Sequence, residues 1–312
     1  MKTITAFFKD LNRNKAMLLM VLPATVWFIC FAYLPMVGMI IAFKEYRYTR
    51  DGFLASIVNS EWLGFENFKF LFNTPDAWII TRNTVLYNAV FIVLGLVMSV
   101  AIAILLSELV NKRLAKMFQT GMFLPHFLSW VIVGYFLFSF LSYDKGVVNQ
   151  VLSWFGADPI QWYNDKTYWP VIIVLVFLWK SVGYNSVIYL AGIMGIDRSL
   201  YEAAMIDGAN KWQQMRKITI PMLMPLIIIL TLLAIGKVFY ADFGLFFQVP
   251  RDSGPLYSVT NVIDTYVYRG LKVTGEIGMS AAAGLYQSVV GFILVITSNW
   301  IVRRIDKDKA LF

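Results

Sequence analysis

The sequence has almost none of the residues that build metal centres and disulfides. Its 312 residues include one cysteine, Cys30, and one histidine, His126. A single cysteine cannot close an intramolecular disulfide and excludes the Cys/His spacings of zinc sites. A single histidine excludes every motif that needs two of them. Because His126 lies in an apolar stretch, we expect no Ser/His/Asp triad, no metal site and no catalytic residue on this chain.

Charged residues are also scarce. They make up 15% of the chain and hydrophobic residues 59%, whereas ordinary globular domains contain about 25% and 45–50%. This composition excludes a disordered, coiled-coil or collagen-like chain and argues against a soluble one. A phosphate-binding Walker A loop is also missing, because the only Gly-Lys pair, Gly236-Lys237, precedes a valine within an apolar stretch. Any ATP hydrolysis must therefore come from another chain.

Six apolar segments are long enough to cross a bilayer, which takes about 20 residues as a helix. We predict an all-α integral membrane protein in which residues 1–312 form one transmembrane domain. The first segment is too long for the core of a cleaved signal. Residues 3–13 could form a short interfacial helix or an unstructured tail. The predicted spans are residues 16–43, 81–110, 118–141, 170–196, 222–247 and 280–302.

The distribution of Lys and Arg indicates the orientation. The segments on the side of the termini hold 15 Lys and Arg residues, and those on the other side hold 9 although they are longer. Cytoplasmic loops of membrane proteins carry the excess of Lys and Arg. Both termini are therefore predicted to be cytoplasmic. The net charge of +8 then indicates contact with anionic lipid and not with nucleic acid.

Residues 197–220, between the fourth and fifth spans, form the most distinctive loop. Ser199 and Glu202 have the spacing of a capping box, which predicts a helix from Leu200 to Asp207 that ends at Gly208. Asn210 and Gln213 repeat that spacing and predict a second short helix. Pro221 suits the first turn of the fifth span. We therefore expect a helix–turn–helix under the membrane.

This loop resembles the EAA loop of ABC importer permeases. The family pattern is E-A-A-x3-G-x9-I-x-L-P, and the chain matches each fixed position except that Ile220 replaces leucine. The resemblance implies a type I ABC importer permease fold and a loop that docks on a separate ATPase subunit. The residues implied in this coupling are Glu202, Ala203, Ala204, Asp207, Gly208, Ile218 and Pro221.

Further motifs are similar to permeases for oligosaccharides and polysaccharides that work with lipoprotein binding proteins. They include residues 33–38 in the first span, 64–68 after it and 124–130 in the third. The resemblance implies a multi-pass protein of the bacterial cytoplasmic membrane that imports an oligosaccharide. The implied partners are a second, different permease, two ATPase subunits that bind ATP and Mg, and an extracytoplasmic substrate-binding lipoprotein.

Polar residues within the apolar segments point to the substrate path, because such residues are costly in lipid. We expect six of them to line a sugar cavity: Lys180, Tyr184, Asn185, Lys237, Tyr240 and Gln287. Alternatively, the two lysines pair with acids such as Asp242 at the interface with a partner, or extend to the membrane boundary. Two residues have plainer interpretations. Glu108 is expected to pair with Lys112 and Arg113, and His126 to be packed and hydrogen-bonded at a kink after Pro125.

Three other functions remain possible from the residues alone. A self-sufficient secondary transporter or channel would show paired halves or ion-binding carboxylates at mid-membrane, and only Asp242 lies well inside a span. An intramembrane enzyme lacks its nucleophile and base. An ABC importer permease for a solute other than a sugar would carry the same EAA loop.

Overall fold

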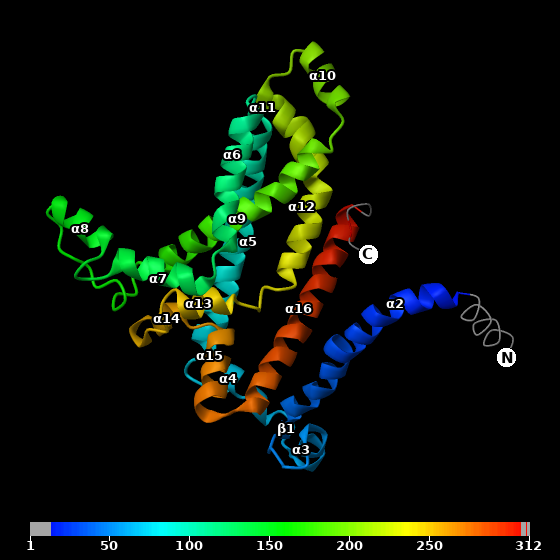
Figure 1. The fold of residues 1–312 in the computed structure, drawn as a ribbon, viewed down its shortest axis with the longest axis vertical. Coiled ribbons are helices and arrows are strands. Elements are labelled where there is room, and N and C mark those ends of the chain that lie inside the picture. Colours follow the sequence, from blue (N-terminus) through cyan, green and yellow to red (C-terminus); the bar gives the residue numbers. More distant parts are fainter. Residues whose placement is uncertain (1–13, 307–309, 311–312) are drawn as a thin grey trace. The chain divides into compact units, whose positions relative to one another are not determined.

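The computed structural model describes residues 14–306 and residue 310, which divide into two compact units. The first unit comprises residues 1–70 and 271–285, and the second comprises residues 71–270 and 286–312. Both are built almost entirely of helices (Figure 1). The helix or tail expected at residues 3–13 lies outside the described residues.

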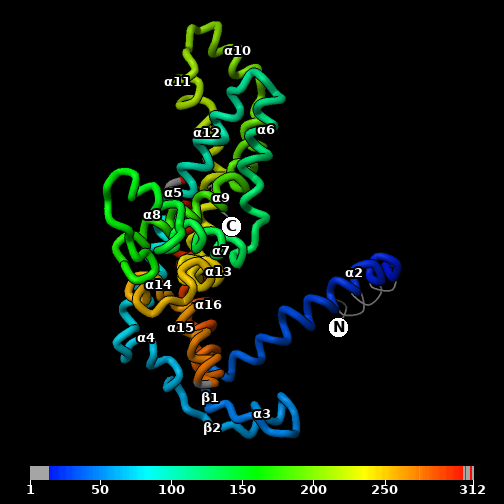
Figure 2. Tube along the Cα trace, turned by 60° about the vertical axis from the view of Figure 1, so that its left-hand side comes forward, coloured from blue at the N-terminus to red at the C-terminus, as the bar shows by residue number. Residues whose placement is uncertain are grey.

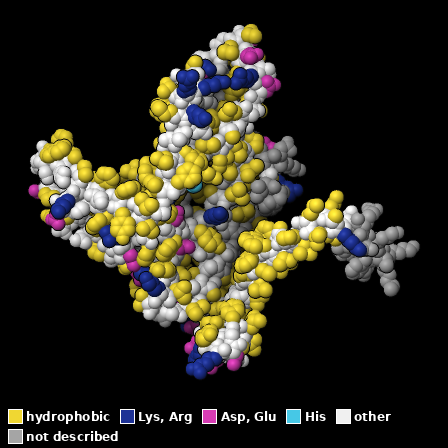
Figure 3. Space-filling view, viewed as in Figure 1, with side chains coloured by type: hydrophobic (Ala, Val, Ile, Leu, Met, Phe, Trp, Pro, Cys, Tyr) yellow, Lys and Arg dark blue, Asp and Glu magenta, His cyan; other side chains and the backbone are white. Residues whose placement is uncertain are grey.

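The first apolar segment forms one helical rod in the first unit. It runs as α2 (Lys15–Phe28), a π-helical turn η1 (Ile29–Tyr33) and a 3-10 helix η2 (Leu34–Phe43). Pro35 lacks the N–H that a continuing α-helix would donate to the carbonyl of residue 31, so the hydrogen-bonding pattern must change here. No residue of α2 is buried within the chain, and apolar side chains cover it (Figure 3). This surface must face lipid or another protein.

The first unit also contains a small two-stranded sheet with short helices. Strands β1 (Lys44–Glu45) and β2 (Glu61–Trp62) pair antiparallel, with helix α3 (Phe53–Asn59) between them and a 3-10 turn η3 (Glu66–Phe68) after them. The ammonium of Lys44 donates to the carbonyl of Ile57 at 2.7 Å. These bonds satisfy backbone groups that the short elements leave free.

The second unit is organised around long helices. Helix α5 (Ala77–Ser107) lies beside α9 (Trp169–Met194), and α12 (Ile220–Ile235) packs against both (Figures 1 and 2). Helix α16 (Ile277–Ile305) runs from the first unit into the second. The remaining helical elements are α4 (Phe70–Asn73), α6 (Lys112–Phe123), η4 (Leu124–Phe127), α7 (Trp130–Leu141), α8 (Val147–Trp154), α10 (Arg198–Ile206), α11 (Lys211–Gln214), η5 (Met215–Thr219), α13 (Phe243–Gln248), η6 (Gly254–Leu256), α14 (Tyr257–Thr260), α15 (Ile263–Arg269) and η7 (Gly270–Thr274).

Two apolar clusters hold the second unit together. One gathers Tyr87 and Phe91 of α5 with Trp169 of α9 and Phe246 of α13. The other joins α5, α9 and α12 through Ala103, Tyr189, Ile193 and Leu223. Close helix approach also depends on Gly183, where a Cβ would lie 1.8 Å from the carbonyl oxygen of Met122 in α6. The helices that form the site are therefore fixed by direct backbone contact.

The predicted third span is not one continuous helix. Residues 112–127 and 130–141 form two helical pieces that meet at 98°. Pro125 has no N–H to donate, Leu128 is extended, and Ser129 starts α7 by accepting a bond from the backbone N–H of Ile132 at 3.3 Å. The kink expected after Pro125 is present, but it is far sharper than a bend within one helix.

The predicted fifth segment, residues 222–247, is also wrong as one helix. Helix α12 ends at Ile235, and the chain becomes helical again only at Phe243 in α13. At its other end the helical run starts earlier than expected, because α11, η5 and α12 follow one another without a gap from Lys211 to Ile235. Five helical runs in the described residues are long and apolar enough to cross a bilayer, or six if the bent pair forms one span.

Candidate functional site

The loop between α9 and α12 begins with a well-capped helix. The carboxylate of Asp197 accepts a bond from the backbone N–H of Ser199 at 3.0 Å, so α10 starts at Arg198. These bonds from Ser199 hold the pKa of the Asp197 carboxyl below its usual range. The expected capping box at Ser199 and Glu202 is therefore wrong, because Asp197 caps the helix two residues earlier.

The end of α10 and the start of α11 agree with the prediction. Gly208 has a φ of +78°, a conformation that glycine adopts without strain, and α10 ends just before it. Asn210 and Gln213 form a complete capping box, with reciprocal bonds of 2.9 and 2.8 Å. Pro221 lies in the first turn of α12. Helices α11, η5 and α12 follow one another without a gap, so the loop is continuous with α12.

The loop carries an exposed carboxylate and several exposed apolar side chains. Glu202 is exposed, and its carboxylate has no hydrogen-bond or ion-pair partner within the described part of the chain. Beside it, the exposed fractions of Met205, Ile206 and Trp212 are 55%, 87% and 67%. Such a surface is suited to binding another protein.

A groove of about 690 Å³ lies between α5, α6, α9 and α10, and Glu202 and Met205 are among the residues that line it. Glu108, at the end of α5, pairs with Lys211 of α11 at 2.8 Å. The expected pair of Glu108 with Lys112 or Arg113 is therefore wrong. The hydroxyl of Tyr201 bonds that of Thr219 at 2.9 Å, which joins α10 to the base of α12. These two contacts tie the loop to the helices on either side.

Lys180 stabilises the bend in the third segment. Its ammonium donates to the carbonyls of His126 at 2.7 Å and Leu128 at 2.6 Å, with a longer bond to that of Pro125, and it lies 5.1 Å from the ring centre of Trp130. Carbonyls that lose their helical partners at a bend must find another donor in a membrane. Trp130 in turn donates to Asp242 at 2.8 Å, so the proposed Lys180–Asp242 proximity is indirect.

Tyr184 and His126 form a stacked pair next to this bend. Their ring centres lie 4.2 Å apart and their planes differ by 11°, and Phe123 contacts Tyr184 from the side. His126 therefore lies at a kink with an aromatic partner, but its side chain is exposed and makes no hydrogen bond in the described residues, so the expected packed, hydrogen-bonded side chain is wrong in that respect.

Side chains from three helices satisfy the backbone between α12 and α13. The amide of Asn88 donates to the carbonyls of Val238 and Tyr240, and that of Gln287 to the carbonyl of Phe239 at 2.7 Å. Asp264 accepts from the backbone N–H of Ala241 at 2.8 Å and from Gln287. Gln287 thus supports an irregular segment and does not line an open space. Non-helical backbone at membrane depth needs such partners.

Three of the six predicted path residues line one cavity. A cavity of about 520 Å³ between α5, α9 and the end of α12 contains Asn185, Lys237 and Tyr240. Lys180, Tyr184 and Gln287 do not line it. The ammonium of Lys237 makes no hydrogen bond or ion pair with the residues that the structure describes, while the hydroxyl of Tyr240 bonds that of Ser288. Asn88 also lines the cavity and was missed; its position as an amide within a long apolar stretch was the available signal.

No group of three or more His, Cys, Asp or Glu within reach of a metal ion occurs among the residues that the structure describes. The polar side chains of the cavity are amides, hydroxyls, an ammonium and the carboxylate of Asp242, which suit hydrogen bonding to a polar solute.

Comparisons with known proteins identify relatives that align with nearly the whole chain. Residues 92–307 match the family model described as binding-protein-dependent transport system inner membrane component. The chain is 34% identical to Protein LplB of Bacillus subtilis (strain 168), an alignment that covers 96% of this chain and 92% of that protein. It is 33% identical to the polygalacturonan/rhamnogalacturonan transport system permease protein YteP of the same organism, covering 96% and 91%.

A solved structure extends the likeness to the fold. The crystal structure of a bacterial ABC transporter involved in the import of the acidic polysaccharide alginate contains a chain 33% identical to this one, with a TM-score of 0.86, covering 96% of this chain and 99% of that one. The expected type I permease fold is confirmed, and the chain is a translocation subunit and not an enzyme. A secondary transporter and an intramembrane enzyme are both excluded. The chain belongs to the family of binding-protein-dependent transport system inner membrane components.

Proposed function

We propose that this chain is one of two permease subunits of an ABC importer that carries an oligosaccharide or polysaccharide fragment into a bacterial cell. The observation that carries the proposal is the near full-length match to YteP, named for polygalacturonan and rhamnogalacturonan, and to the alginate transporter chain. A related structure contains alginate pentasaccharide bound to a periplasmic protein. The substrate here is therefore proposed to arrive on an extracytoplasmic binding protein, which the resemblance implies is a lipoprotein.

The chain must work with further subunits, because it has no ATP-binding motif of its own. It has no Walker A motif, so two ATPase subunits must bind the ATP and Mg. A second, different permease would complete the path. The uncovered apolar surface of α2 fits lipid or this partner. We also propose that both termini are cytoplasmic, because Lys and Arg are concentrated on their side.

The exposed face of α10 is proposed to dock on an ATPase subunit. Glu202 offers an unpaired carboxylate, and Met205, Ile206 and Trp212 offer apolar area around it. Ala203 and Ala204 are small, and nothing lies within 4 Å of the space a Cβ would take at Gly208, so a partner could approach closely. Asp207 ends the helix beside it.

Movement of the docked loop would pass directly to the membrane helices. Closure of the ATPases on ATP would displace α10, and the Tyr201–Thr219 bond would pass the displacement to the base of α12. Ile218 and Pro221 lie in the helical run that joins α11 to α12. The coupling requires that the loop contact its partner differently in the two states.

The substrate path is proposed to run along the cavity lined by Asn185, Lys237 and Tyr240. These side chains would replace water around sugar hydroxyls in a path that crosses hydrocarbon. Tyr184, stacked on His126 with 40% of its surface exposed, offers an aromatic face for a sugar ring. Lys180 and Gln287 are proposed to act indirectly, by holding the bend and the break that shape the path.

Reconstituted transport tests this function. The chain would be purified with its partner permease and ATPase, placed in proteoliposomes with the binding protein outside, and assayed for uptake of a labelled oligogalacturonate. We expect uptake that requires ATP inside. Glu202→Gln should lower it about tenfold or more, because a hydrogen bond between a charged group and its partner contributes about 1.5–3 kcal/mol.

Glu61→Gln is the matched control, since it removes an exposed carboxylate from β2 without touching the loop. Its uptake should equal that of the wild type. Uptake that proceeds without the ATPase, or that Glu202→Gln and Glu61→Gln reduce equally, would refute the proposed coupling.

A further inference from the structure

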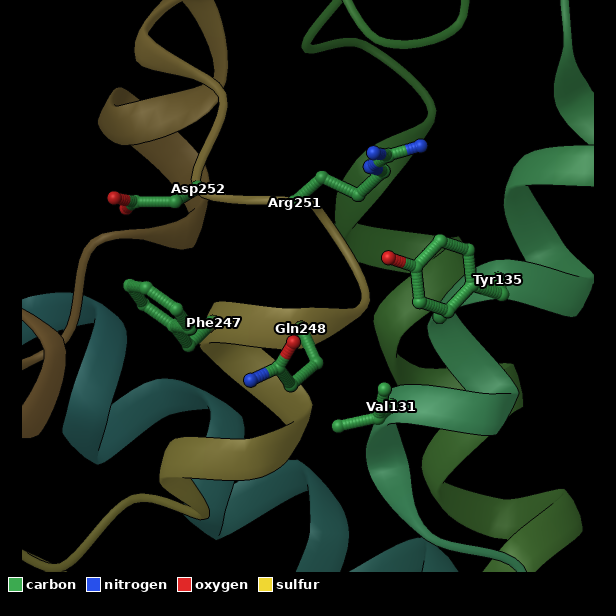
Figure 4. Close-up of a pocket in the computed structure, with 7 residues that line it drawn as sticks. Val131, Tyr135, Phe247, Gln248, Arg251 and Asp252 are labelled. Atoms are coloured by element: carbon green, nitrogen blue, oxygen red, sulfur yellow. The ribbon is translucent and has the colours of Figure 1, made fainter.

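A second cavity of about 240 Å³ lies in the same unit, between α7, the end of α13 and the loop that follows α13 (Figure 4). Tyr135, Gln248 and Arg251 line it from three directions. It shares no lining residue with the proposed path between α5, α9 and α12. A ligand bound here would therefore occupy a separate site.

The walls of this cavity are rigid. A Cβ at Gly134 of α7 would lie 2.5 Å from the carbonyl oxygen of Gln248, so α7 and α13 touch through their backbones. Arg251 and Asp252 have φ values of 56° and 48° and are the only non-glycine residues with positive φ in the described part of the chain. Such backbone persists only where surrounding contacts enforce it, and it is concentrated at ligand sites.

Asp252, which also lines the cavity, makes side-chain contacts that help to hold this backbone. Its carboxylate pairs with Arg269 at 2.7 Å and accepts a bond from the hydroxyl of Tyr257 at 3.2 Å. Its side chain points away from that of Arg251 (Figure 4). The carboxylate nearest in sequence to Arg251 is therefore already occupied.

Three polar groups at the cavity have no partner of their own. In the residues that the structure describes, the guanidinium of Arg251, the hydroxyl of Tyr135 and the amide of Gln248 make no hydrogen bond, and Arg251 makes no ion pair. The guanidinium carbon of Arg251 lies over two aromatic rings, 4.1 Å from the ring centre of Phe138 and 5.5 Å from that of Tyr135. Its planar set of donors is thus held in place before any ligand arrives.

The size and chemistry of the cavity select a small acidic sugar unit. Its volume is below the roughly 300–1,000 Å³ of pockets for drug-sized ligands, which suits a single ring. A guanidinium binds a carboxylate through two parallel bonds. An aromatic ring offers a face to the C–H groups of a sugar, and an amide and a phenol can bond its hydroxyls.

We propose that this cavity binds one uronic acid unit of an oligosaccharide, with the sugar carboxylate on Arg251 and its hydroxyls on Gln248 and Tyr135. The inference rests on the proposed function as a saccharide importer and narrows its substrate class to acidic sugars. The sugar carboxylate would then be recognised at a site separate from the proposed path between α5, α9 and α12.

Saturation-transfer NMR on the purified importer complex tests the site without transport. The probes are trigalacturonate and its neutral counterpart, galactotriose. We expect the stronger saturation signal from trigalacturonate, because only it offers a carboxylate to Arg251, and Arg251→Gln should weaken its binding about tenfold or more. Arg251→Lys keeps the charge but loses the paired bonds, so it should bind with intermediate strength.

Arg47→Gln is the matched control, because it removes one positive charge from an exposed arginine that already pairs with Glu45. It should bind trigalacturonate as the wild type does. Equal binding of the two probes, or equal binding by Arg251→Gln and Arg47→Gln at matched thermal stability, would overturn the proposal. Loss of ATP-driven uptake with trigalacturonate binding intact would instead count against the proposed function and leave the site in place.

Discussion

Replacement of Lys180 by methionine separates a structural role from contact with substrate. Methionine is one atom shorter than lysine, is also unbranched, and has no donor. In the structure the Lys180 ammonium donates to the carbonyls of His126 and Leu128 at 2.7 and 2.6 Å. Both carbonyls lie at the 98° bend in the third segment. Without Lys180 they lose their donor in a region where water is scarce.

The magnitude follows from these two bonds. A hydrogen bond that involves a charged group contributes about 1.5–3 kcal/mol. Because Lys180 is only partly buried, the lower value applies to each, which gives about 3 kcal/mol in total. Since about 1.4 kcal/mol corresponds to a factor of ten, opening of the bend should become about 100-fold more frequent.

Hydrogen exchange of the purified complex measures this opening. The amides of Leu128, Ile132 and Val133, which are bonded at the bend, should exchange faster by up to that factor in Lys180→Met. Lys237→Met is the control, because it removes the second lysine of the predicted path, whose ammonium has no partner in the described residues. Its exchange at the bend should be unchanged. Normal exchange in Lys180→Met combined with slower sugar uptake would refute the structural role and assign Lys180 to substrate contact.

Three further substitutions test the loop and the broken helix. Gly208→Ala should destabilise the end of α10 by about 1–2 kcal/mol, because φ is +78° there, whereas Gly208→Asn should destabilise it less. Hydrogen exchange of the Ala209 amide measures both effects. Equal effects of the two variants would contradict the explanation from backbone conformation. Reversing either charge of the exposed Glu108–Lys211 pair should lower the free energy of unfolding by less than about 1 kcal/mol. Reversing both charges should restore the melting temperature. A double variant less stable than either single variant would show that loss of the ion pair does not cause the destabilisation. Gln287→Leu should cost about 1–3 kcal/mol by leaving the Phe239 carbonyl without a donor, and an unchanged melting temperature would rule out its supporting role.

Local chemistry made several features predictable. The capping box of Asn210 and Gln213, the helix end at Gly208 and the position of Pro221 each depend on residues within one or two turns, so their spacing was sufficient. The long apolar segments at α5, α9 and α16 were predictable for the same reason. The one local error, at Ser199, arose because Asp197 is an equally good cap and lies earlier in the chain.

The breaks in the helices were not predictable from the apolar pattern. Residues 236–242 lie inside the predicted span, yet α12 ends before them, and Asn88, Asp264 and Gln287 provide other partners for their backbone. Those residues lie far away in the sequence. The same holds for Lys180, whose acceptors precede it by more than 50 residues, and for Glu108, which pairs with Lys211 and not with its neighbours.

The sequence by itself determined the membrane class, the EAA loop and its two short helices, and the absence of an ATP-binding motif. Only the tertiary structure decided which polar residues line a cavity and which support the backbone: Asn185, Lys237 and Tyr240 face the open space, and Lys180 and Gln287 do not. The physical reason is that a polar side chain in an apolar helix needs a partner. The sequence shows that need, and only the packing of distant segments shows whether protein or substrate meets it.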